Sequence, residues 1–172
     1  MAGEILRDTV TPCVANDHPE EDNTKILDKE KHREYQSLIG MAQWLVTPGR
    51  LNICYAISSL SRFCSSPRES HYKRVLRLWG YLQKYPDKSI CFDARKPMYN
   101  IKEFEQLKPD FEDQYRYASE EIDPRFPEAL HKELVVSIFF DSNHGHDKVT
   151  GMSISGKLVM IGRTPLIWKS KR

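Results

Sequence analysis

The 172-residue sequence predicts an α+β fold in which a three-helix segment is followed by a three-stranded antiparallel sheet. Apolar residues recur at helical spacing between residues 32 and 85, and a proline comes directly after that range. Three short β-rich runs then follow one another between residues 134 and 170. The length corresponds to one domain, or to two small ones, at roughly 150 residues per domain.

Composition divides the chain into four segments. Residues 1–31 are predicted to form an extended lead-in, because their prolines and acidic cluster leave little to pack. Residues 32–93 form the helical segment. Residues 94–133 are expected to be a linker or irregular connection, with a short helix near Glu103–Lys108. Residues 134–172 contain the predicted sheet.

The first two helices are predicted from their apolar faces. One face begins at Tyr35 and continues until the sequence Thr-Pro-Gly at 47–49 ends the helix. A second helix is expected from about Leu51 to Cys64, where apolar residues again fall on one side.

The third helix has the clearest start. Ser66, Pro67 and Glu69 match the N-cap, the N1 proline and the N3 acid of a capping box. Pro86 follows the expected end near Tyr85. The apolar residues of this helix share one face: Tyr72, Val75, Leu76, Trp79 and Leu82.

Basic side chains gather on the opposite face of the third helix. Lys73, Arg77 and Lys84 lie within about 40° of one another at 100° per residue, and Arg74 flanks them. Residues 35–88 carry 8 basic and 2 acidic side chains, so the surrounding segment is basic as well. Such a face is either an ordinary solvated surface or a surface that contacts the phosphates of a nucleic acid.

Strands are predicted in four places. A short one is expected at Ser89–Asp93. The other three, at Leu134–Phe140, within Thr150–Gly162 and at Thr164–Lys169, form an antiparallel meander. A sheet of this size needs a helix over its apolar face, so either an earlier helix covers it or the domain is cut short.

Several classes of protein do not fit the composition. No run approaches the 18 or so consecutive apolar residues of a membrane span, and Met1–Val10 lacks the apolar core of a secretory signal. The four cysteines form no Cys-x-x-Cys pair, which argues against a zinc ribbon, a thioredoxin-like site and a disulfide scaffold. We therefore expect reduced thiols and an intracellular location, with cytoplasm and nucleus not distinguishable.

Asp141 is the strongest single candidate for chemistry. It directly follows an apolar run, so its carboxylate is expected at the end of a packed strand, where carboxylates can hold Mg²⁺ together with phosphate oxygens. The alternative is a turn aspartate that caps the loop at 142–148. A calcium loop is excluded, because Gly145 stands where it needs an oxygen ligand. A zinc site from His144 and His146 lacks partners at the usual spacing.

Two stretches of the chain resemble copia-type retrotransposon polyproteins. The first resembles the segment after the reverse-transcriptase palm, and carries in the family's order YQSLIG at 35–40, RLNICYAI at 50–57, LSRF at 60–63 and KRVLR at 73–77. The second resembles the start of the family's ribonuclease H domain, with FDSN at 140–143, Asp147, SISG at 153–156 and IWKSK at 167–171. The resemblance covers about residues 10–93 and 134–172.

The resemblance implies a function for each matching segment. Residues 32–93 would be the post-palm connection, and residues 134–172 a truncated, ribonuclease H-like start of a sheet. The intact parent would be an RNA-directed DNA polymerase that also cleaves the RNA of an RNA–DNA hybrid with Mg²⁺. Asp141 matches the first aspartate of the family's ribonuclease H motif, so the catalytic and metal-ligand role transfers to it. The implied partners are the rest of the polyprotein and an RNA–DNA hybrid or other nucleic acid, with no membrane, and the candidate contacts are Lys73, Arg74, Arg77 and Lys84.

The chain also departs from the family pattern. Leu51 and Asn52 stand where the family has Pro and Asp, and Asn143 replaces an Asp. The other ribonuclease H carboxylates fall beyond the position that matches Arg172, and the sequence contains no Asp-Asp pair of the polymerase kind. We therefore expect a fragment that is inactive alone. The alternative is a non-catalytic nucleic-acid-binding or interaction remnant, and the flanking genomic sequence discriminates between the two.

Overall fold

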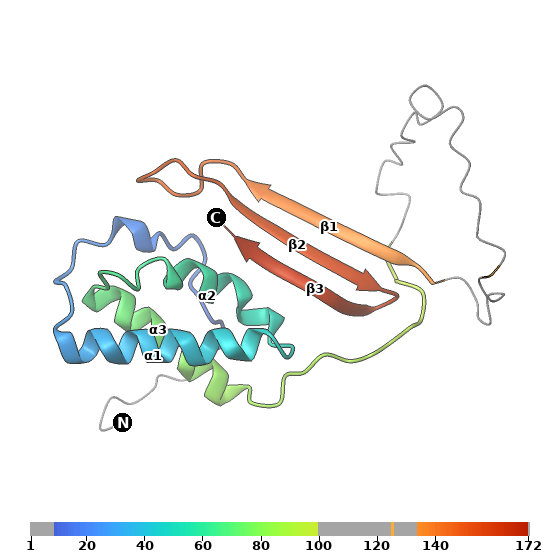
Figure 1. Ribbon diagram of the computed structural model, residues 1–172, viewed down its shortest axis with the longest axis horizontal. Coiled ribbons are helices and arrows are strands. Elements are labelled where there is room, and N and C mark those ends of the chain that lie inside the picture. The colour runs from blue at the N-terminus through green and yellow to red at the C-terminus, as the bar shows by residue number, and fades with distance from the viewer. Residues whose placement is uncertain (1–8, 100–124, 126–133, 172) are drawn as a thin grey trace.

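The computed structural model of the protein describes residues 9–99, 125 and 134–171. Helices and strands follow in the order α1 (Lys29–Val46), α2 (Cys54–Ser61), α3 (Glu69–Lys84), β1 (Val136–Asn143), β2 (Ile154–Ile161) and β3 (Thr164–Lys171). Short 3₁₀ turns, η1 (Pro19–Glu21) and η2 (Leu51–Ile53), precede α1 and α2. The helices lie together beside a three-stranded antiparallel sheet of order β1-β2-β3, which confirms the α+β class (Figure 1).

One apolar core joins the three helices. Tyr35 of α1 is fully buried, and its hydroxyl donates a 2.7 Å hydrogen bond to the carbonyl of Leu60 in α2. The helix begins at its N-cap Asp28, whose carboxylate accepts hydrogen bonds from two amides of the first turn. The other members of the core come from all three helices and their flanks: Leu27, Leu38, Ile39, Ala42, Ile53, Ala56, Ile57, Tyr72, Val75, Leu78, Tyr81 and Leu82, with Leu60.

The second helix is shorter than predicted. The sequence predicts one helix from Leu51 to Cys64, whereas the structure has the 3₁₀ turn η2, then α2, which ends at Ser61. The amide of Phe63 donates to the carbonyl of Leu60 at 3.1 Å, and that of Cys64 to Ser61 at 3.3 Å. These i to i−3 bonds tighten the chain beyond α2 into turns instead of prolonging the α-helix.

The third helix begins later than predicted, with Arg68 and not Ser66 as its N-cap. The reason is a contact with the lead-in, where Ile26 and Arg68 form an antiparallel bridge and the amide of Leu27 donates to the carbonyl of Pro67. This bridge keeps the chain extended up to Arg68. The cap is then completed by His71, whose Nδ1 accepts from the amide of Arg68 at 3.1 Å.

The lead-in packs more than the sequence predicts. Pro19 and Leu27 are buried, and the hydroxyl of Thr9 donates to the carbonyl of Arg77 in α3 at 3.0 Å. The expectation that residues 1–31 leave little to pack is therefore wrong for the described part of that segment. The helix expected near Glu103–Lys108 lies outside the described residues.

The sheet differs from the prediction in two places. Ser89–Asp93 is not a strand, although the amide of Asp93 donates to the hydroxyl of Thr164, 2.6 Å away at the start of β3. β1 continues to Asn143, so Asp141 lies within the strand, opposite Gly156 of β2, and not at its end. The pairing of Asp141 with Gly156 is regular, and β1 continues to pair with β2 for two more residues after Asp141.

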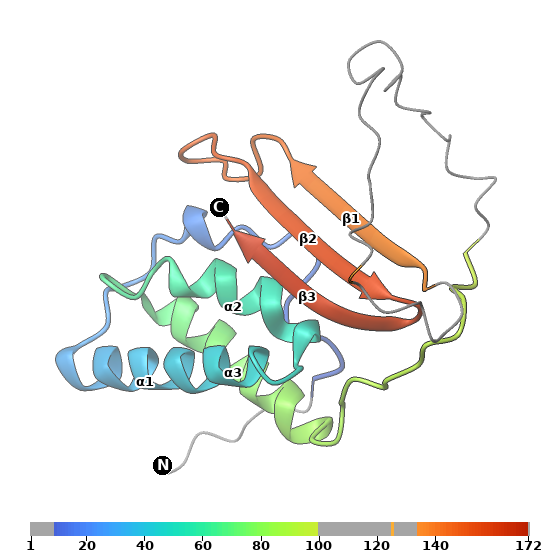
Figure 2. The same ribbon diagram turned by 45° about the vertical axis from the view of Figure 1, so that its right-hand side comes forward.

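An earlier helix meets the sheet, but at β3 rather than across all three strands. The hydroxyl of Ser58 in α2 donates to the carbonyl of Ser170, and the indole of Trp168 donates to the carbonyl of Val46 at the end of α1. In the two ribbon views the helices accordingly lie next to β3, and β1 is the strand farthest from them (Figures 1 and 2). Among the described helices, none is long and apolar enough to cross a membrane.

Candidate nucleic-acid interface and the Asp141 strand

The four basic candidates on α3 do not form one continuous surface. Lys73 and Lys84 are exposed, whereas Arg74 and Arg77 are partly buried. The two lysines are eleven positions apart in sequence, which places them about 20° apart around the helix axis and about 16 Å apart along it. The lysines therefore lie on one side of α3, as the sequence predicts, whereas the side chains of the two arginines are hydrogen-bonded to other parts of the protein.

Arg74 is held by the lead-in. Its guanidinium donates two hydrogen bonds of 2.7 Å to the two carboxylate oxygens of Asp17, and a third bond to the hydroxyl of Ser70. The hydrogen bonds to Asp17 raise the pKa of Arg74. A bidentate pair of this kind fixes the plane of the guanidinium, so Arg74 points at Asp17 in this structure.

Arg77 lies beneath the same segment. Its Nη2 donates to the hydroxyl of Thr11 at 3.0 Å, and its backbone carbonyl accepts from Thr9. The lead-in thus covers the part of α3 that carries the two arginines. Of the four candidates, the structure leaves Lys73 and Lys84 at the surface.

Asp141 is the sixth of the eight residues of β1. Its side chain is exposed, and its partner across the ladder is Gly156, which has no side chain of its own. A methyl group placed on Gly156 would lie 3.9 Å from the Cβ of Asp141. Gly156 therefore adds no side chain beside the Asp141 carboxylate on the neighbouring strand.

The second acid of this region, Asp147, has a structural role. It is completely buried, and it forms an ion pair with Arg62 at the end of α2. Its other carboxylate oxygen accepts from the amides of Val149 and Thr150 at 3.0 and 2.8 Å. Burial alone would raise the pKa of Asp147, but the hydrogen bonds from Thr150 and the charge of Arg62 hold it below its usual value.

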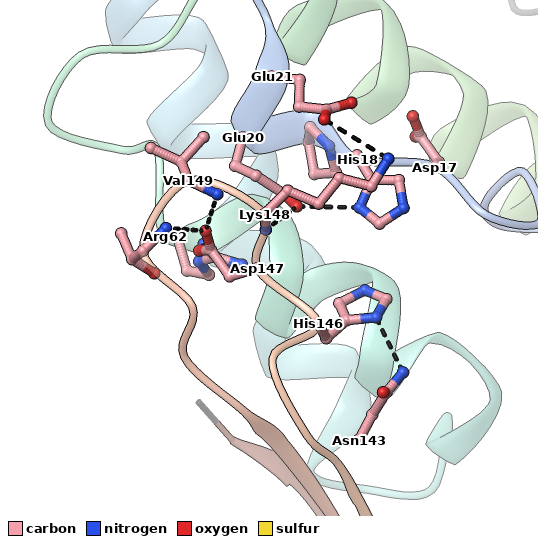
Figure 3. Close-up of polar contacts among 12 residues, drawn as sticks. Asp17, His18, Glu20, Glu21, Arg62, Asn143, His146, Asp147, Lys148 and Val149 are labelled. Atoms are coloured by element: carbon pink, nitrogen blue, oxygen red, sulfur yellow. Dashed lines mark hydrogen bonds and ion pairs between the residues drawn. The ribbon is translucent and has the colours of Figure 1, made fainter.

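The loop around Asp147 also contacts the lead-in (Figure 3). Glu20 accepts from His18 Nδ1 at 3.0 Å and from the amide of Lys148 at 3.2 Å, and Lys148 Nζ lies 3.5 Å from Glu21. The β1–β2 loop is thereby fixed between α2 and residues 17–21.

The two loop histidines are not arranged as metal ligands. His146 is bonded through Nε2 to the hydroxyl of Tyr55 and through Nδ1 to the side-chain amide nitrogen of Asn143, at 3.0 and 2.9 Å. The ring nitrogen of His144 lies 3.5 Å from Ser153. In the described residues, no three His, Cys, Asp or Glu side chains gather closely enough to hold a metal ion.

The role of Arg62 and Asp147 was not predicted. Both residues belong to the resemblance, Arg62 in LSRF and Asp147 after FDSN, and that shared membership is the only signal that connects them. They stand 85 residues apart in the sequence. No local pattern relates positions at that distance.

The comparisons with known proteins point to retrotransposons. The chain is 25% identical over 138 residues to a putative transposon Ty5-1 protein of Saccharomyces cerevisiae, a match over 80% of this chain and 33% of that protein. It is 24% identical over 149 residues to a retrovirus-related Pol polyprotein from transposon RE1 of Arabidopsis thaliana, a match over 87% of this chain and 7% of that polyprotein. No family model matches the chain, and no solved structure matches it significantly.

These relatives are retrotransposon polyproteins at low identity, which supports an origin of this chain in a retrotransposon Pol polyprotein. The chain spans a third or less of the length of the relatives it matches. A match of 149 residues in a chain of 172 has to include α1, α2 and α3 as well as β1, so the similarity joins the helical segment to the sheet.

Proposed function

We propose that this chain is the part of a retrotransposon Pol polyprotein in which the post-palm segment of a reverse transcriptase is followed by the start of a ribonuclease H domain. The observation that carries this proposal is the order of the motifs. YQSLIG, LSRF and KRVLR lie in or beside the three helices, and FDSN, SISG and IWKSK lie in or beside the three strands. The similarity to the RE1 polyprotein covers 149 residues, enough to include residues of both parts.

In this proposal the intact parent copies RNA into DNA and cleaves the RNA of the hybrid, and this segment contributes contacts to the hybrid. Lys73 and Lys84 are the candidate phosphate contacts, because both are exposed on one side of α3. Arg77 and Arg74 would join them only after the lead-in releases them, since Thr11 and Asp17 hold their guanidinium groups.

Asp141 is the proposed metal ligand of the intact parent. Two-metal hydrolysis needs several carboxylates around ions about 4 Å apart. Within residues 134–171 Asp141 is the one exposed carboxylate, since Asp147 is buried against Arg62, and no three potential ligands gather among the described residues. They do not fit a resident Mg²⁺ site, so we derive no catalytic step for this chain and propose that it is inactive alone.

Salt dependence of binding tests the α3 contacts. We would measure the affinity of the chain for a 20-base-pair RNA–DNA hybrid by fluorescence anisotropy over a range of KCl concentrations. Replacing Lys73 and Lys84 by Gln is expected to lower the slope of log affinity against log salt by about 0.9 for each lysine that contacts a phosphate.

A matched control removes the same charge elsewhere. Lys29 is the first residue of α1 and Lys25 lies in the lead-in four residues before it, and both are exposed. Their double replacement by Gln is expected to leave the slope close to that of the unmodified chain. Equal slopes in all three proteins would reject α3 as the interface. They would favour the alternative that the chain is an interaction remnant without a nucleic-acid surface on this helix.

A further inference from the structure

The sheet has an outer face that the described helices do not cover. Residues alternate between the two faces of a strand, and Trp168 on the inner face bonds to Val46 of α1. The outer face therefore carries every second residue, counted through the pairing register: Val136, Ile138, Phe140 and Ser142 of β1, Ser155, Lys157, Val159 and Ile161 of β2, and Ile167, Lys169 and Lys171 of β3.

An aromatic ring and two lysines form one row across this outer face. Phe140 is opposite Lys157, which is opposite Lys169, so the row runs through all three strands. The Phe140 side chain is 73% exposed, and Lys157 Nζ lies over one side of its ring, 6.0 Å from the ring centre. Lys171 follows two residues after Lys169 and projects from the same face.

The charge on the outer face has one sign. Residues 134–171 contain two acids, Asp141 and Asp147. Asp141 belongs to the inner face by alternation, and Asp147 is buried in the loop. Among the described residues, no carboxylate lies within ion-pair distance of Lys157, Lys169 or Lys171. The face thus offers an exposed ring next to three cations. This arrangement is complementary to a polyanion that carries planar groups able to stack on the ring.

We propose that the outer face binds single-stranded nucleic acid, with a base stacked on Phe140 and backbone phosphates on Lys157, Lys169 and Lys171. Aromatic side chains on a sheet, next to cations, bind single strands because every base has a face that stacks. In a duplex the bases are stacked on one another, so their faces are not free for Phe140. Ile138 and Ile167, in the neighbouring row, extend the apolar platform on one side of the ring. This site is separate from α3 and does not depend on the contacts proposed there.

The test compares a single strand with a duplex on the full chain. Affinity is measured by fluorescence anisotropy with a labelled 20-mer of thymidine and with a blunt 20-base-pair DNA duplex. We expect Phe140→Ala to weaken binding of the single strand about tenfold or more and to leave duplex affinity unchanged. Phe140→Trp is expected to retain the single-strand affinity and to add fluorescence that the bound bases quench.

Phe92 provides the matched control, because its ring is 86% exposed outside the sheet. Phe92→Ala is expected to bind both nucleic acids like the unmodified chain. Replacing Lys157, Lys169 and Lys171 by Gln should lower the salt slope for the single strand by about 0.7 for each phosphate contact. When Phe140→Ala is combined with the Lys73 and Lys84 double variant, it should weaken single-strand binding as much as it does in the unmodified chain. That result would separate this site from the α3 surface.

Three results would overturn the proposal. The first is a single-strand affinity that Phe140→Ala does not change, or that Phe92→Ala lowers equally. The second is a loss of duplex affinity in Phe140→Ala that equals its loss of single-strand affinity. The third is a dimer of the unmodified chain that Phe140→Ala dissociates in analytical ultracentrifugation, because the outer face would then be covered by a second copy.

Discussion

Arg62 and Asp147 form a buried ion pair across the boundary between the helices and the sheet. Arg62 follows the last residue of α2, and Asp147 lies in the loop between β1 and β2. The same carboxylate also accepts two backbone hydrogen bonds within its loop. A single side chain therefore sets the conformation of the loop and its attachment to the helical core.

We expect Asp147→Asn to lower the free energy of unfolding by about 3 kcal/mol, because it leaves Arg62 as a mostly buried charge without its partner. Urea denaturation measures the change. Asp141→Asn is the control, since Asp141 is exposed and its replacement should stay within about 0.5 kcal/mol of the unmodified chain. Equal stabilities of the two variants would show that the ion pair contributes nothing.

His71 is expected to make folding stability decrease as the pH falls below 6.5. Its Nδ1 accepts from the amide of Arg68, so the proton is on Nε2, which donates to the carbonyl of Pro19 at 2.8 Å. Burial lowers the pKa of His71 below its ordinary value of 6.5, although Pro19 and Asp22 oppose the shift. As the pH falls below 6.5, the unfolded chain takes up a proton that the folded chain resists, so stability decreases.

The slope of stability against pH isolates this contribution. His71→Gln should unfold at lower urea throughout, but its stability should fall less steeply from pH 7 to pH 5 than that of the unmodified chain. Parallel curves for the two proteins would contradict the assignment, whatever their difference in absolute stability.

Releasing Arg74 is expected to strengthen nucleic-acid binding. Asp17→Asn removes the carboxylate charge that accepts two hydrogen bonds from the guanidinium, which leaves Asp22 at 3.9 Å and the bond to Ser70. Arg74 is then held less tightly and gains freedom to reach a phosphate beside Lys73. The salt slope for an RNA–DNA hybrid should become steeper by about 0.9. Glu30→Gln removes the same charge from the exposed first turn of α1 and should leave the slope unchanged. If both variants behave alike, the gain comes from net charge and not from Arg74.

The isolated chain is expected not to cleave an RNA–DNA hybrid in the presence of Mg²⁺. Asp141 is the one exposed carboxylate on the described strands, and a single carboxylate holds Mg²⁺ weakly. A labelled-hybrid cleavage assay should give the same background for the unmodified chain and for Asp141→Asn. Cleavage that appears with Mg²⁺ and is lost in Asp141→Asn would mean that further ligands come from this chain or from a second copy.

Local patterns predicted the elements and long-range contacts decided their ends. The helical period gave α1 and α3, and the β-rich runs gave all three strands of the sheet. The predicted cap at Ser66 failed because a bridge from Ile26 to Arg68 keeps that stretch extended. The strand predicted at Ser89–Asp93 is absent, because a short local sequence cannot show whether a neighbouring strand is available for pairing.

In the candidate site, too, local patterns predicted some features and long-range contacts determined the others. Periodicity placed Lys73 and Lys84 together on α3. It could not show that Asp17, which lies 57 residues before Arg74, pairs with that arginine. Nor could it show that β1 runs beyond Asp141, since that depends on the partner residues of β2.

The contacts of the lead-in also set an order for folding. α1, α2 and α3 meet through residues that are near one another in sequence, and such contacts form quickly because little chain has to be closed. The bond from the Lys148 amide to Glu20 spans 128 residues, and the bond from Ser58 to Ser170 spans 112. During synthesis the helices can therefore assemble first. The bonds of Glu20 and Ser58 form afterwards, because their partners are synthesised more than a hundred residues later.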